Sequence, residues 1–177
     1  MEHDLQVRIL KELLEQLDTG KNVDAGVQYK MSTDVYTCSE IAAREREAFF
    51  LKHPQLIGLS GDLPEPNTWF TIDDFGVPVL ATRNQAGEFK AFVNACRHRG
   101  ARLTKEARGK GSRFICPFHA WTYSTSGELL GIPQQDHFGP LTDACDGLIS
   151  LPATEHKGML WSHPAPEGEL DIAAQLG

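Results

Sequence analysis

The sequence predicts a mainly β fold, an antiparallel β-sandwich with a helical extension at its N-terminus. From residue 55 onward, short runs of β-branched and aromatic residues alternate with turn residues, a spacing typical of small sandwiches and barrels. Before residue 55, apolar residues recur with the period of amphipathic helices. A chain of 177 residues that is 41% hydrophobic and 23% charged is long enough to bury one ordinary core.

The first 54 residues are expected to be largely helical. Residues 4–18 have a helical pattern that ends near Gly20, with an apolar stripe made of Leu5, Ile9, Leu13 and Leu17. Residues 21–37 are mixed polar and small residues, which indicates an extended connector. Ser39 is a suitable N-cap for a second helix, and Pro54 ends that helix. The apolar stripe must pack against this chain or against another subunit.

Nine short strands are predicted between residues 56 and 161. They are Leu56–Leu59, Thr68–Ile72, Val77–Thr82, Phe89–Asn94, Arg113–Cys116, Trp121–Tyr123, Glu128–Ile132, Leu148–Leu151 and Met159–Trp161. The segments between them contain the Gly, Pro, Asn and Asp residues that turns require. After residue 163 the strand pattern is lost, and residues 164–177 resemble a linker.

The charge of the chain is unevenly distributed. The net charge is −7, which argues against a nucleic-acid partner. Residues 97–113 nevertheless hold seven basic residues and one acidic residue, so this segment carries +6 and the rest of the chain −13. Such a basic segment indicates either work at a nearby site, a docking surface, or simply a solvated loop. No secretory signal or apolar run of ~20 residues is visible, so no membrane partner and a cytoplasmic setting are expected.

Two cysteine–histidine motifs are the main candidates for chemistry. The first is Cys96-x-His98 and the second is Cys116-x-x-His119, with 17 residues between them. Two thiolates and two imidazoles can hold one metal ion, or two irons of a sulfide-bridged cluster. The other cysteines, Cys38 and Cys145, have no histidine at ligand spacing and are interpreted as ordinary small side chains.

The residues around the motifs favour a cluster over zinc. Structural zinc sites usually pair like ligands on each arm, whereas each arm here carries one Cys and one His. Rigid and apolar residues flank both motifs: Gly100, Pro117, Phe118, Trp121 and Tyr123. A redox cluster depends on a dry surrounding, and a zinc ion does not. Zinc remains the alternative at this point.

The two motifs, CRHRG and CPFHAWTY, resemble the Rieske [2Fe–2S] motif. Residues 30–177 further resemble the α subunits of aromatic-ring-hydroxylating Rieske oxygenases, including the run DLPEPNTWF before the first motif and SGELLGIP after the second. The resemblance implies a Rieske-type antiparallel β-sandwich with the cluster at the tip of two loops. Cys96 and Cys116 would ligate one iron, and His98 and His119 the other.

The resemblance also implies a domain order and a function. Residues 1–54 would be a helical extension, 55–163 the Rieske [2Fe–2S] domain, and 164–177 the start of a linker to an absent catalytic domain. The expected function is one-electron transfer to the mononuclear Fe(II) of a ring-hydroxylating dioxygenase or monooxygenase of aromatic hydrocarbon catabolism. A ferredoxin or flavin reductase would donate the electrons, and the catalytic domain of the same or a neighbouring α subunit would accept them.

The sequence itself contains no match to the family's mononuclear iron motif, D-x-x-H-x-x-x-x-H. The histidines outside the two motifs are His3, His53, His137, His156 and His163. No two of them have the required spacing, so no catalytic residue is expected and it stays open whether the chain alone is an enzyme. A standalone Rieske ferredoxin is the alternative, although a bare carrier needs no helical extension.

The resemblance predicts a low reduction potential. High-potential Rieske proteins have a disulfide between the two loops, at positions that correspond here to Ala101 and Phe118, and a serine where this chain has Trp121. Tyr123, which can donate to a cysteine sulfur, is kept. The potential is therefore expected near the bottom of the roughly −150 to +300 mV Rieske range. Ala120 replaces a usual glycine, which would cost ~1 kcal/mol if φ is positive there.

Overall fold

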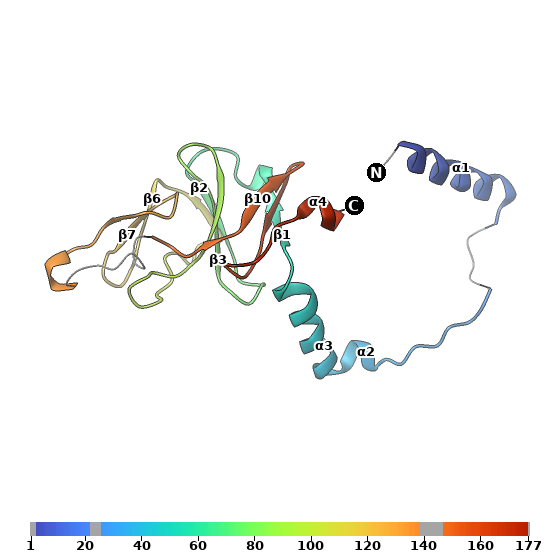
Figure 1. Cartoon of the computed structure of the whole chain (residues 1–177), viewed down its shortest axis with the longest axis horizontal. Coiled ribbons are helices and arrows are strands. Elements are labelled where there is room, and N and C mark those ends of the chain that lie inside the picture. The colour runs from blue at the N-terminus through green and yellow to red at the C-terminus, as the bar shows by residue number, and fades with distance from the viewer. Residues whose placement is uncertain (1–2, 22–25, 139–146, 177) are drawn as a thin grey trace. The chain divides into compact units, whose positions relative to one another are not determined.

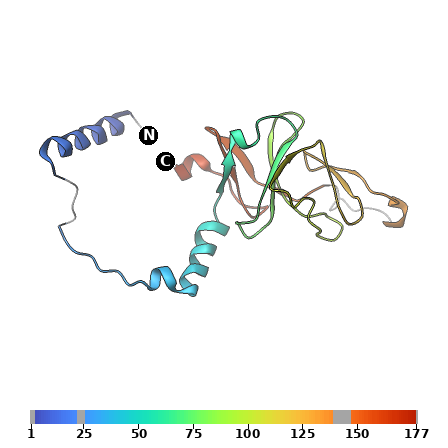
Figure 2. The ribbon, with the colours of Figure 1, turned by 180° about the vertical axis from the view of Figure 1, so that it is seen from behind.

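The computed structural model describes residues 3–21, 26–138 and 147–176. Contacts divide the chain into two units, of which Ala43–Ile172 contains all the strands (Figures 1 and 2). The predicted boundaries at residues 54 and 163 stay a prediction, and the prediction for Cys145 falls outside the described residues.

The N-terminal helices form largely where the sequence predicts them. Helix α1 spans His3–Thr19, and α3 (Ser39–Glu45) continues into a π-helical turn, η1 (Arg46–Leu51). The expectation of an extended segment up to residue 37 is wrong at its end, because Asp34–Thr37 form a short helix, α2. The carbonyl of Cys38, rather than that of Ser39, accepts the first backbone hydrogen bond of α3, from Ala42.

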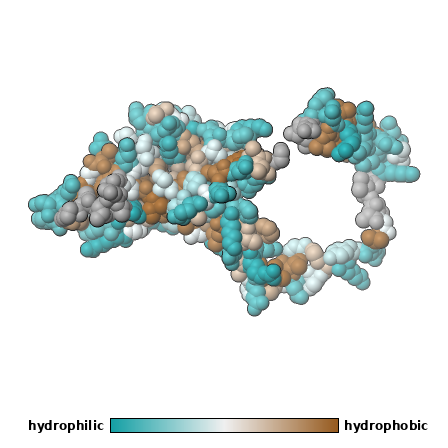
Figure 3. All heavy atoms as spheres, in the orientation of Figure 1, coloured by the Kyte–Doolittle hydropathy of each residue, from teal (hydrophilic) through white to brown (hydrophobic). Residues whose placement is uncertain are grey.

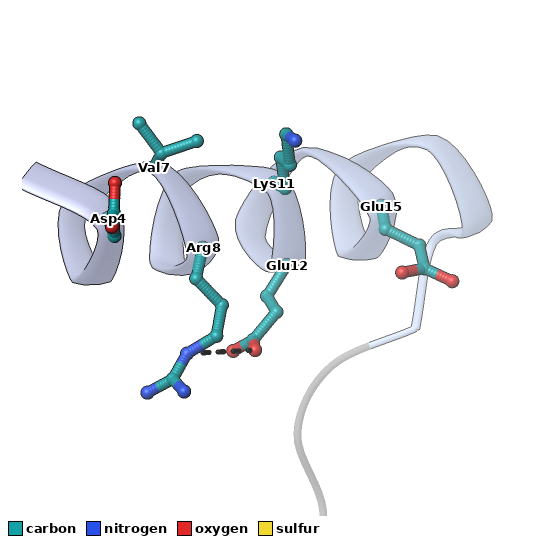
Figure 4. Close-up of a pocket in the computed structure, with 6 residues that line it drawn as sticks. All are labelled: Asp4, Val7, Arg8, Lys11, Glu12 and Glu15. Atoms are coloured by element: carbon teal, nitrogen blue, oxygen red, sulfur yellow. Dashed lines mark ion pairs between the residues drawn. The ribbon is translucent and has the colours of Figure 1, made fainter.

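Helix α1 exposes its apolar stripe, as the hydrophobic residues on its surface in Figure 3 show. No residue of α1 is buried, and Leu17 is 77% exposed. The opposite side is polar, with a 3.9 Å ion pair between Arg8 and Glu12 (Figure 4). A shallow hollow lies along this polar side, but a single helix supplies all its walls, so it is an open surface.

The centre of the β unit is a five-stranded antiparallel sheet. Its strand order is β5-β2-β3-β4-β9, formed by Arg108–Lys110, Thr68–Ile72, Val79–Arg83, Phe89–Val93 and Ser150–Leu151. A second sheet has the order β1-β11-β10, formed by Gln55–Leu59, Met159–Ser162 and Ala153–His156. A third has the order β6-β7-β8, formed by Arg113–Ile115, Thr122–Ser124 and Leu129–Gly131. The mainly antiparallel β fold is thereby confirmed.

Alternate residues of the central sheet belong to two separate cores. Val79 and Ala81 of β3 pack in one core with Leu160 of β11, so this core joins the first two sheets. Leu80 and Phe92, which point to the other face of the central sheet, pack in a second core. The second core contains the two cysteines of the motifs, so both loops pack against this face of the central sheet.

Every predicted strand has a counterpart in the structure, and two strands were not predicted. Strand β5 is too polar to be recognised, and it pairs with β2 because Gly109 leaves room for a neighbouring ring. A Cβ atom at Gly109 would lie 2.4 Å from the indole of Trp69. Strand β10 is similarly polar. The remaining elements are the 3-10 turns η2 (Ser60–Asp62) and η3 (Gln135–Phe138) and helix α4 (Ile172–Leu176).

Among the described residues, no helix is both long and apolar enough to cross a bilayer.

Candidate metal centre

The first motif lies in a loop that leaves the end of β4. The backbone N–H of Cys96 donates to the carbonyl of Ala101 at 2.8 Å, and the N–H of Gly100 donates back to the carbonyl of Cys96 at 2.8 Å. This tight turn needs a residue with positive φ, and Gly100 has φ +69°. The loop therefore holds Cys96 and His98 close to each other.

Asn94 connects the two ends of this loop by hydrogen bonds. Its side chain is fully buried, its Nδ2 donates to the carbonyl of Thr104 at 2.8 Å, and its Oδ1 accepts from the N–H of Leu103 at 3.2 Å. The backbone N–H of Asn94 donates to the carbonyl of Pro78 at 2.7 Å. One side chain thus connects the end of β4 with the far end of the loop. Sequence inspection had not singled out Asn94, since an asparagine at a strand end ordinarily indicates a turn.

The second motif lies in the turn between β6 and β7. The N–H of Cys116 donates to the carbonyl of Trp121 at 2.8 Å, and the N–H of Ala120 donates to the carbonyl of Cys116 at 3.0 Å. Ala120 has φ +57°, the left-handed conformation that was considered in the sequence. The strained alanine closes the turn that places Cys116 and His119 on the same side as the first loop.

The structure brings the predicted ligand side chains together as two pairs, one of cysteines and one of histidines. Cys96 and Cys116 are 2% and 3% exposed and share the second core. The rings of His98 and His119 lie 4.8 Å apart between centroids. Burial is the main cause that raises the pKa of the Cys96 thiol, and the neighbouring Cys116 raises it further. Burial also lowers the pKa of His98, which favours the neutral imidazole that a metal requires.

Aromatic side chains pack against the two histidines. Trp121 stacks on His98 with ring centroids 5.1 Å apart and planes 6° apart. Phe138 packs edge-on against the rings of His98 and Trp121, with ring centroids 5.2 Å and 5.5 Å away. The ring centroids of Phe118 and His119 lie 3.9 Å apart. Phe138 carried no signal in the sequence, because it comes from a short 3-10 turn beyond the strands that hold the motifs.

Tyr123 contacts the first motif from strand β7. Its hydroxyl oxygen lies 3.3 Å from Sγ of Cys96 and accepts the N–H of Arg97 at 3.1 Å. A thiolate at Cys96 has no proton to donate, so with a metal-ligating Cys96 the hydroxyl would be the donor to the sulfur. Burial, followed by the hydrogen bond with Cys96, raises the pKa of Tyr123, so this proton stays in place. The expectation that Tyr123 serves a cysteine sulfur agrees with this geometry.

The donor set fits a two-iron cluster better than one metal ion. Nδ1 of His119 is buried and has no hydrogen-bond partner among the described residues. A metal ion bound to this nitrogen would supply the missing partner. In the same part of the chain, no three His, Cys, Asp or Glu side chains are grouped as a single ion would need. A Rieske cluster needs only two protein ligands on each iron.

The other predicted features lie apart from this centre. His163 is buried, and its Nδ1 accepts the N–H of Ala165 at 3.0 Å, while His156 belongs to β10. Several cations of the basic segment pair with acids of the β unit: Arg102 with Asp73 at 2.6 Å, Lys110 with Glu65 at 2.6 Å and Arg108 with Asp62 at 3.7 Å. Three cations of the positive segment are therefore paired with acidic side chains of the same unit.

Comparison with known proteins places the chain in a family. The family model of the Rieske [2Fe-2S] domain matches residues 53–152, more than half of the chain. The large subunit of anthranilate 1,2-dioxygenase from Acinetobacter baylyi is 38% identical over 104 residues, which cover 59% of this chain and 22% of that protein. The glycine betaine monooxygenase oxygenase subunit from Chromohalobacter salexigens is 34% identical over 126 residues, covering 71% and 28%.

Solved structures agree with these relatives. A quaternary ammonium Rieske monooxygenase in complex with L-carnitine superposes with a TM-score of 0.75 and 27% identity, covering 85% of this chain and 42% of that one. Naphthalene 1,2-dioxygenase superposes with a TM-score of 0.71 and 25% identity, covering 81% and 32%. The chain thus spans well under half the length of the proteins that it matches, and it corresponds to their N-terminal part. It belongs to the Rieske [2Fe–2S] domain family, in the form that the α subunits of Rieske oxygenases carry.

Proposed function

We propose that Cys96 and Cys116 ligate one iron of the Rieske [2Fe–2S] cluster and that His98 and His119 ligate the other. The observation that carries this assignment is the buried, unpartnered Nδ1 of His119, whose ring packs against that of His98, while the thiols of both motifs are buried. A buried imidazole nitrogen without a partner is costly unless a ligand completes it. The assigned pairs follow the general Rieske pattern of two cysteines on one iron and two histidines on the other.

The function that this centre supports best is one-electron transfer. When bound, the cluster accepts and releases one electron, changing its charge from zero to −1 with two thiolate ligands. The protein contributes the surroundings: Trp121 and Phe138 pack against the ring of His98, and Tyr123 offers a proton to the Cys96 sulfur. A dry site and hydrogen bonds to sulfur are the features that set the potential of such a cluster.

As part of the same proposal, the electron passes to a mononuclear iron in a catalytic domain of the same or a neighbouring α subunit. The relatives are oxygenase subunits much longer than this chain, and inter-subunit electron transfer is described for a similar quaternary ammonium Rieske monooxygenase. A ferredoxin or flavin reductase would supply the electron. The free thiols of Cys96 and Cys116 suit a reducing compartment such as the cytoplasm. A standalone ferredoxin is less favoured, because the relatives are oxygenase subunits.

For the complete enzyme, an aromatic substrate remains the first proposal. Anthranilate, toluate and benzene dioxygenases are among the relatives. A quaternary ammonium substrate is the second, because glycine betaine and carnitine monooxygenases are relatives too. Purified full-length enzyme that oxidises benzoate-type acids and leaves betaines unchanged would support the first proposal, and the opposite preference would support the second.

The ligand assignment is tested on the chain itself. The purified chain should contain equal amounts of iron and acid-labile sulfide, absorb visible light, and give an EPR signal only after reduction. His119→Ala should lose the cluster, while His156→Ala, which changes a histidine in β10, should keep it. A colourless chain with stoichiometric zinc and no sulfide would refute the assignment, as would His119→Ala with an unchanged spectrum.

A further inference from the structure

The indole N–H of Trp121 is a buried donor without an acceptor. Trp121 is 2% exposed, and its Nε1 has no hydrogen-bond partner among the described residues. Folded proteins satisfy nearly all buried N–H groups, because removing such a group from water without a replacement partner costs free energy. A group that binds at this place could supply the acceptor for this N–H.

The position of Trp121 indicates which group that is. The indole stacks on the ring of His98, and the carbonyl of Trp121 accepts the N–H of Cys116, so the residue lies between the two motifs. A second buried atom without a partner, Nδ1 of His119, belongs to the same group of rings. Two such atoms at one centre, one of them an N–H donor, are explained together by a single bound group that has both metal and acceptor atoms.

We propose that the indole N–H of Trp121 donates a hydrogen bond to a sulfur atom of the [2Fe–2S] cluster. This inference rests on the proposed function. A donor near sulfur stabilises the reduced cluster more than the oxidised one, because reduction adds a negative charge. Trp121 therefore raises the reduction potential, in addition to packing against His98. From the sequence, Trp121 counted only as the loss of a serine hydroxyl. In the structure, its indole N–H is another donor at that position.

The substitution Trp121→Phe separates the two roles, because phenylalanine keeps an aromatic ring against His98 and removes the N–H. The variant should retain the visible absorption and EPR signal of the cluster and have a lower midpoint potential. A tenfold loss in the equilibrium constant for reduction, which corresponds to about 59 mV for one electron, is expected. An unchanged midpoint potential in Trp121→Phe would overturn the inference. A water molecule found as the acceptor of the Trp121 indole N–H in a crystal structure with the cluster would overturn it too.

The chain offers a matched control in Trp161→Phe. Trp161 is also a buried tryptophan whose Nε1 has no partner among the described residues, but it lies in β11, in a different sheet from the ligand loops. This variant should lose stability without any change in potential. An equal shift of potential in both variants would overturn the inference, because a general loosening of the fold would then explain it.

A measurement on the unchanged chain covers the case in which Trp121→Phe fails to assemble the cluster. With tryptophan labelled by ¹⁵N at the indole nitrogen, pulsed EPR of the reduced chain should detect a ¹⁵N coupling to the cluster. Absence of this coupling would overturn the inference. Absence of any cluster in the unchanged chain would instead refute the proposed function, so the two failures are distinguishable.

Discussion

The hydroxyl oxygen of Tyr123 lies 3.3 Å from Sγ of Cys96 and accepts the backbone N–H of Arg97 at 3.1 Å. Replacing Tyr123 by phenylalanine removes a donor to the sulfur and leaves the Arg97 N–H without this acceptor. A hydrogen bond of about 0.5–1.5 kcal/mol predicts a midpoint potential lower by roughly 20–65 mV in Tyr123→Phe, measured by redox titration. Tyr36→Phe, at an exposed tyrosine of α2, should leave the potential unchanged; an equal shift there would contradict the prediction.

The unsubstituted chain should have a low reduction potential. Ala101 and Phe118, at the positions where a disulfide would join the two loops, cannot form one, and Phe118 is 58% exposed to water. We expect a midpoint near the bottom of the roughly −150 to +300 mV range of Rieske centres. Redox titration followed by EPR measures it, and a value above about +100 mV would contradict this expectation.

Asn94→Ala should destabilise the first ligand loop. The substitution leaves the part-buried carbonyl of Thr104 and the buried N–H of Leu103 without their partners. We expect a loss of about 1–3 kcal/mol in the free energy of unfolding and a lower iron content. Asn84→Ala is the control, because Asn84 is also buried but belongs to the turn between β3 and β4. It should cost stability while the iron content stays normal.

Ala120→Gly should stabilise the chain. Ala120 has φ +57°, a conformation that costs a residue with a Cβ atom about 1 kcal/mol relative to glycine. The free energy of unfolding, measured with denaturant, should therefore rise by about 1 kcal/mol. Ala107→Gly, at a position outside the positive-φ residues, should instead lower it. Destabilisation in Ala120→Gly would show that the turn does not store this strain.

The ion pair between Arg83 of β3 and Glu155 of β10 makes stability depend on pH. Their hydrogen bond lowers the pKa of Glu155 below its ordinary value of 4.5, and Ser60 contributes in the same direction. A lowered folded-state pKa adds stability above the unfolded-state pKa, and this stability is lost as the pH falls through the folded-state pKa. Glu155→Gln should thus be less stable than the unsubstituted chain by at most about 1 kcal/mol at neutral pH.

The difference between the two proteins should shrink in denaturant unfolding experiments below pH 4.5, the ordinary value for this group. Glu169→Gln, at an exposed carboxylate, is the control. A constant difference from neutral to acidic pH would attribute the effect of Glu155 to packing.

The positions of the strands were predictable because their apolar residues alternate with well-marked turns. The exceptions, β5 and β10, are polar segments whose pairing depends on neighbours distant in sequence, such as Trp69 above Gly109. The four candidate ligands were predictable because each pair lies within a few residues and its spacing suits a loop. Asn94 and Phe138 were not, since their contacts with the loop and the rings depend on how separate segments fold onto each other.

The type of centre thus follows from the amino-acid sequence: two Cys–His motifs of unequal spacing, flanked by aromatic residues and without cysteines that could link the loops. How the protein surrounds that centre depends on the packing of the folded chain. It places the Tyr123 hydroxyl at the Cys96 sulfur and leaves the Trp121 N–H and the His119 nitrogen buried without partners. The physical reason is that ligand type and spacing are local properties of the chain, whereas burial and hydrogen-bond satisfaction arise only when β4, β6 and β7 pack together.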